Sequence, residues 1–194
     1  MTRTRTIAFE IVQFVPIITL ASSFIVKGGV DLHQAGPLFV ISGVGGLAVT
    51  SALLFFKVLP NPILLATNLW LLFGAVAFGV PLPGLCAILS QTNAVLLFAT
   101  ALLIGVVLTL VKPETGFIGM AGLDAKRTRR LSVILLGIAS IALIWSIVFK
   151  DNIRLGGGLP FIALNVSRRM LMRRAVRRRR SSSAERYSKS KLMS

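Results

Sequence analysis

The feature that most constrains this chain is a succession of apolar stretches, each about as long as a membrane is thick. The clearest is residues 131–149, which contain no charged side chain. A helix that crosses the hydrocarbon core of a bilayer needs about 20 mainly apolar residues. Proline, glycine and charged residues separate the stretches, which predict six spans at about residues 7–26, 37–59, 63–80, 94–111, 131–149 and 155–172.

The composition supports this prediction. Hydrophobic residues make up 55% of the 194-residue chain and charged residues only 14%, whereas soluble domains carry about 25% charged residues. This excludes a water-soluble globular enzyme and a disordered protein, and the single cysteine, Cys86, excludes a disulfide scaffold. We therefore expect an all-α integral membrane protein, with a transmembrane bundle at residues 1–167 and an arginine-rich tail at 168–194.

Two of the six segments allow other readings. The sixth begins with three glycines and Pro160, and its apolar part, 155–167, is short for a span. It can cross with its arginines reaching the interface, re-enter, or lie on the surface as an amphipathic helix. The first segment also resembles a signal peptide with a small-residue cleavage site at 21–23. Glu10 and Gln13 inside that segment argue against cleavage.

The distribution of lysine and arginine predicts the topology. These residues favour cytoplasmic loops. With six crossings and a cytoplasmic N-terminus, only Lys27, Lys150 and Arg154 fall outside, while the cluster 126–130 and the tail both fall inside. Five crossings would put that cluster and the tail on opposite sides. We therefore predict that both termini are cytoplasmic, and the short loops suit a bacterial inner membrane.

Glu10 and Gln13 form the candidate polar site within the membrane. Glu10 is the only acidic residue in a predicted span, and Gln13 lies three positions later on the same helical face. An ionisable group in a membrane costs free energy and is a functional candidate for that reason. The structural alternative is an interfacial Glu10 that favours the helix dipole near Arg3 or Arg5. Asp31 and His33 are better explained as residues of a solvated loop.

Small residues recur at four-residue spacing, which lets helix backbones approach closely. We expect helix packing at Ser42, Gly46, Thr50, Ala75, Gly79, Ala101 and Gly105. Gly116, Gly119 and Gly122 follow no strand and precede no phosphate-loop lysine. We expect them to form a flexible loop.

The most specific feature of the chain is its basic tail. A juxtamembrane basic cluster is attracted to anionic lipid by about 1 kcal/mol per charge. We expect lipid contacts from Arg168, Arg169, Arg173, Arg174, Arg177, Arg178, Arg179 and Arg180. RNA, for instance on a ribosome, is the less favoured partner, because Tyr187 is the only aromatic residue there for stacking. Phosphorylation of Ser181–Ser183 would release the tail.

The sequence contains no catalytic constellation and no nucleotide motif. With one histidine and widely spaced carboxylates, we expect no metal and no cofactor. We predict a non-catalytic membrane subunit or assembly and scaffold factor, with membrane-protein partners or as a homo-oligomer. The alternative is a small permease or channel, working as a homodimer, with Glu10 and Gln13 near its path.

Overall fold

The chain is all-helical in the part that the structure describes. The computed structural model describes the backbone at residues 12–26, 32–80, 83–92, 94–120, 122–152 and 154–192, and side chains at 12–20, 36–80, 84–92, 94–120, 122–152 and 154–176. The helices are α2 (Val15–Val26), α3 (Leu32–Phe55), α4 (Pro62–Gly79), α5 (Pro83–Thr92), α6 (Ala94–Val111), α7 (Ala125–Val148), the short π-helix η1 (Arg154–Gly158) and α8 (Leu159–Leu192).

Four helices among the described residues are long and apolar enough to cross a membrane. They are Gly36–Phe55 within α3, Pro62–Gly79, Ala94–Val111 and Ala125–Val148. The prediction of an all-helical protein with several membrane-crossing helices is confirmed to this extent. The predicted spans at 63–80 and 94–111 differ from α4 and α6 by no more than one residue at either end.

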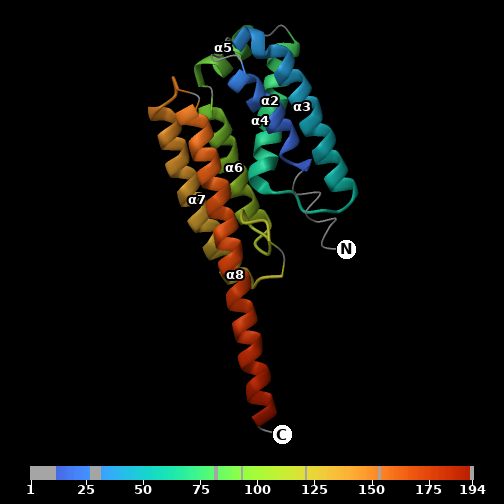
Figure 1. Cartoon of the computed structure of the whole chain (residues 1–194), viewed down its shortest axis with the longest axis vertical. Helices are drawn as coiled ribbons and strands as arrows, with labels where there is room; N and C mark the ends of the chain where they lie inside the picture. The colour runs from blue at the N-terminus through green and yellow to red at the C-terminus, as the bar shows by residue number, and fades with distance from the viewer. Residues whose placement is uncertain are drawn as a thin grey trace.

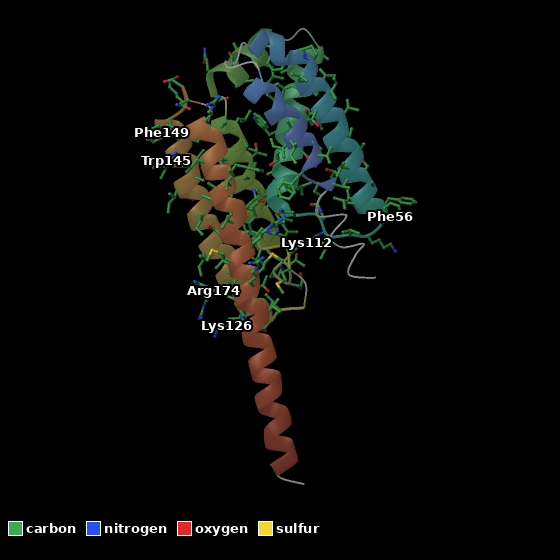
Figure 2. The ribbon with its side chains drawn as sticks, in the orientation of Figure 1. Phe56, Lys112, Lys126, Trp145, Phe149 and Arg174 are labelled. Atoms are coloured by element: carbon green, nitrogen blue, oxygen red, sulfur yellow. The ribbon has the colours of Figure 1, made fainter. Side chains whose placement is uncertain are left out.

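The long helices run in alternating directions (Figure 1). Helix α2 packs on α3, α3 on α4, α6 on α7 and α7 on α8, while α4 and α6 join the two groups. Lys112, Lys126 and Arg174 lie toward one end of the bundle, and Trp145 and Phe149 lie toward the other (Figure 2). We call the first of these the basic end, formed by residues 56–61, 112–120, 122–127 and 168–174.

Helix α3 begins and ends earlier than the predicted span 37–59. Its last turn closes with two hydrogen bonds, from the Val58 N–H to the Leu53 carbonyl at 2.9 Å and from the Lys57 N–H to the Leu54 carbonyl at 3.0 Å. Lys57 adopts a positive φ of 54°. This is the helix-ending motif that glycine usually provides, so the sequence, with lysine there, did not signal it.

Helix α7 begins at Ala125, six residues before the predicted start at 131. We expected a loop over residues 112–130, between two predicted spans, and this expectation is wrong for the last six residues, 125–130. Lysine and arginine have high helix propensity, and the buried side chains of Thr128 and Ser132 fix this turn inside the protein. The basic cluster 126–130 is thus helical.

The sixth segment is longer than the predicted helix 155–172. The π-helix η1 leads directly into α8, which continues for 34 residues and passes Arg168 without a break. Gly156 lies against the end of α7, because a β-carbon there would meet the carbonyl oxygen of Phe149 at 2.5 Å. Gly156 therefore serves close packing, whereas nothing lies within 4 Å of a β-carbon at Gly158.

The segment that follows α6 is part of the core. Phe117 and Ile118 are fully buried and pack with Leu135, Phe98 and Leu164 from three helices. The expectation of a flexible loop around Gly116 and Gly119 is therefore wrong. The positive φ angles of these glycines allow the chain to turn so that the two apolar side chains between them point inward.

The tightest contact between helices joins α3 to α4. A β-carbon at Gly43 would lie 2.6 Å from the Leu71 carbonyl oxygen and 2.5 Å from the Ala75 β-carbon. Near this contact, the ring centroids of Phe39 and Trp70 lie 5.3 Å apart in an edge-to-face arrangement. The α3–α4 pair is thus packed almost backbone to backbone, as small residues allow in membrane helices.

Candidate functional site

A cavity of about 320 Å³ opens at the basic end, between the starts of α2 and α4 and the middle of α8. Its lining combines polar and cationic side chains with an apolar wall. The lining residues are Gln13, Phe14, Leu59, Asn61, Leu64, Gly119, Arg168, Arg169, Met172 and Arg173.

One wall of the cavity is a pair of amides that links α2 to α4. Gln13 is only 4% exposed, and its Oε1 accepts a hydrogen bond from the Asn61 N–H at 2.9 Å. Asn61 caps α4, since its Oδ1 accepts from the Ile63 N–H at 3.1 Å and Pro62 follows at the first helical position. The candidate Gln13 therefore lines the cavity and holds a helix start in place.

Arg168 joins the opposite wall to the buried segment after α6. Its Nε donates a hydrogen bond to the Ile118 carbonyl oxygen at 2.9 Å. The next residue, Gly119, has a φ of +65°, and a β-carbon there would meet Pro62 Cδ at 2.6 Å and Arg168 Nη2 at 3.2 Å. Only glycine suits both the backbone conformation and the space. Gly119 thus allows α4, α8 and this segment to meet.

Arg169 and Arg173 provide the remaining positive charge of the cavity. The guanidinium carbon of Arg169 lies 6.0 Å from the centroid of the Phe14 ring, within the range of a cation–π interaction. Both arginines are solvent-exposed. Among the described residues, every charged side chain that lines the cavity is cationic. Three like charges gather along one side of the cavity, which favours a positive potential there.

The structure divides the eight predicted lipid-contact arginines into three groups. Arg168, Arg169 and Arg173 line the cavity, whereas Arg174 does not. Arg174 is exposed toward the basic end (Figure 2). Arg177, Arg178, Arg179 and Arg180 continue along α8, and their side chains lie outside the described residues. Glu10, the other candidate for a polar site within the membrane, also lies outside the described residues.

The predicted packing residues of α3 lie near α4. Ser42 is 1% exposed, a β-carbon at Gly46 would meet Asn68 Oδ1 at 3.1 Å, and Thr50 Oγ1 accepts a hydrogen bond from Asn68 Nδ2 at 2.9 Å. From α4, Ala75 meets Gly43, a glycine that the four-residue pattern passed over.

The other packing candidates lie at different contacts. A β-carbon at Gly79 would be 3.6 Å from Val40, an ordinary contact distance. Ala101 of α6 is 1% exposed. A β-carbon at Gly105 would meet Leu136 of α7 at 2.8 Å and Phe117 at 2.9 Å. The pattern thus found residues at two helix contacts, α3–α4 and α6–α7.

Sequence reasoning missed the cavity and three of its parts. Asn61 was not among the predicted site residues, Gly119 was assigned to a flexible loop, and Met172 to the overlap of the sixth predicted span, 155–172, with the tail, 168–194. The Asn-Pro pair at 61–62 is a helix-start signal that identifies the cap. No local pattern indicates that residues 13, 61, 119 and 168–173 come together.

Among the described residues, no three histidine, cysteine, aspartate or glutamate side chains are grouped so that they could hold a metal ion. Asp31 and the side chain of His33 fall outside that description. Comparison of the chain with known protein families, with characterised proteins and with solved structures finds no match. Functional inference therefore rests on the geometry of the molecule.

Proposed function

We propose that this chain is a non-catalytic membrane subunit or assembly factor, with six crossings and both termini on the cytoplasmic side of a bacterial inner membrane. The alternating directions of the helices support this topology (Figure 1). Lys112, Lys126 and Arg174 lie toward one end (Figure 2), as expected for a cytoplasmic surface. The aromatic pair Trp145 and Phe149, with ring centroids 4.7 Å apart, suits the opposite interface.

The observation that carries this proposal is the continuation of α8 beyond the bundle (Figure 1). The last described attachment of α8 is at Ala175, which is 2% exposed and whose carbonyl oxygen accepts from Arg127 Nη2 at 3.2 Å. The helix then continues to Leu192. At 1.5 Å per residue, the whole of α8 is about 51 Å long. Because the sequence of this stretch is rich in arginine, the helix offers a partner a long basic segment.

The native mass of the protein, gently extracted from its own membrane, tests the proposal. We expect it to leave the membrane with stoichiometric partner subunits, and the mass to be unchanged by ribonuclease. A variant that ends at Val176 retains the packed bundle, so we expect it to be extracted in equal amount without the partners. Extraction of the full chain alone, or as a plain homo-oligomer, would refute a subunit role.

A small permease is the second candidate, and one observation favours it: Gln13, a candidate for the path, lines the cavity. Its Oε1, however, already accepts the Asn61 N–H, which is a structural role. Transport paths usually need several polar groups within the membrane. Substrate flux into vesicles that contain the purified chain would be the evidence for this candidate.

A further inference from the structure

The cavity at the basic end has the chemistry of an anion site. Within the part of the chain that the structure describes, its charged lining residues are the cationic Arg168, Arg169 and Arg173. Asn61 adds an amide whose Oδ1 is already used by the Ile63 N–H, so its Nδ2 remains a hydrogen-bond donor. The lining also includes the start of α4, an 18-residue helix, whose N-terminal dipole favours negative charge. Three different sources of positive potential thus face one space.

The three arginines differ in how they are held. Arg168 is half-buried and is fixed by the Ile118 carbonyl, so it defines the wall. Arg169 and Arg173 are exposed, and neither forms an ion pair within the described part of the chain. The guanidinium carbon of Arg169 lies over the Phe14 ring at 6.0 Å, a contact that uses no N–H donor, so the N–H donors can bind an oxyanion. Arg169 and Arg173, one helical turn apart, are therefore the two groups available to a ligand.

The cavity also has an apolar part, which distinguishes a lipid from a soluble anion. Phe14, Leu59, Leu64 and Met172 line it beside the arginines. The cavity lies beside the connection between α3 and α4, two helices that are apolar enough to cross a membrane. An amphiphile with a phosphate next to acyl chains matches this combination, and basic pockets between membrane helices on the cytoplasmic side bind such headgroups.

We propose that this cavity binds the phosphate group of one anionic phospholipid, with Arg169 and Arg173 as the ligand contacts and Arg168 and Asn61 completing the site. The inference rests on the proposed cytoplasmic placement of the basic end. It goes further, because it distinguishes one bound lipid from the general attraction of a basic tail to a charged surface.

Native mass spectrometry of the full chain, titrated with phosphatidylglycerol or phosphatidylcholine in detergent, tests the site. We expect tighter binding of the first phosphatidylglycerol than of phosphatidylcholine. The double variant Arg169→Gln, Arg173→Gln should weaken that first binding step about tenfold or more. The control Lys126→Gln, Arg174→Gln removes the same charge from residues outside the cavity and should change it less than about twofold. Equal losses of phosphatidylglycerol affinity in the two double variants, or no loss in either, would overturn the inference.

Two further measurements separate the causes of failure. Glycerol phosphate, a soluble ester with the same phosphate chemistry, should not displace the lipid at millimolar concentration; displacement would overturn the assignment to lipid. Thermal unfolding of both variants should match the wild type, since neither pair of residues is buried. If Arg169→Gln, Arg173→Gln still leaves the membrane with stoichiometric partners while its lipid affinity equals the wild type, only the lipid site is refuted.

Discussion

The middle of the bundle and its basic end are built in different ways. In the middle, α3 and α4 approach almost backbone to backbone at Gly43. At the basic end, helices meet through polar contacts, such as Gln13 with Asn61 and Arg168 with Ile118. The first arrangement needs the absence of a side chain, whereas the second needs particular donors and acceptors. Substitutions in the middle should therefore affect folding. At the basic end, some substitutions should affect folding and others should affect lipid binding.

The largest effect should come from Gly43→Leu. The added side chain meets the Leu71 backbone, which cannot move aside without shifting α4. We expect a loss of about 3 kcal/mol in the free energy of unfolding, measured by denaturation in mixed micelles. Gly45→Leu is the matched control on the same helix, because nothing lies within 4 Å of a β-carbon there. Equal losses for the two variants would contradict the close α3–α4 contact.

A smaller effect should follow from Arg168→Met. This change leaves the carbonyl of Ile118, a fully buried residue, without its donor, and an unsatisfied buried group costs about 1–3 kcal/mol. The same denaturation assay measures it. Arg174→Met, in an exposed position outside the cavity, should stay within about 0.5 kcal/mol of the wild type. If the Arg168 variant matches the wild type, the contact does not hold α8 in place.

The smallest effect should come from the helix caps. Asn61→Ala removes a cap that accepts from the Ile63 N–H, at an expected cost of about 1 kcal/mol. Asp124 occupies the corresponding position before α7 but makes no capping hydrogen bond with its side chain. Asp124→Ala should therefore lower the free energy of unfolding clearly less than Asn61→Ala does. The reverse order in thermal unfolding would show that Asn61 does not act as a cap.

The membrane-crossing helices were predictable where the chain itself marks their ends. The Pro60-Asn61-Pro62 break defines the start of α4, since proline fits a first turn and disfavours helix in the residue before it. The start of α7 was missed because charge marks the edge of a membrane span but does not stop a helix. Lys126 and Arg127 are charged, yet both lie in the first turn of α7.

For the candidate site, the sequence predicted the types of residue involved but not their arrangement. The tail indicated that arginines would meet anionic groups, but the sequence cannot say that Arg173 lines a cavity and the adjacent Arg174 does not. That distinction depends on the rotation of α8 against α7, which Gly156 and Arg127 help to determine through contacts with distant residues. Four-residue spacing likewise found the α3 packing face without identifying Gly43.

The central claim is that the basic end, including the α8 arginines, faces the cytoplasm. Labelling of single cysteines with a membrane-impermeant maleimide in intact cells tests it, in a Cys86→Ser background with Lys126→Cys, Lys150→Cys or Arg174→Cys. All three positions are exposed. We predict labelling of the Lys150→Cys variant in intact cells, and of the other two only after the membrane is opened. Labelling of Arg174→Cys from outside would contradict six crossings and the cytoplasmic placement of the basic end.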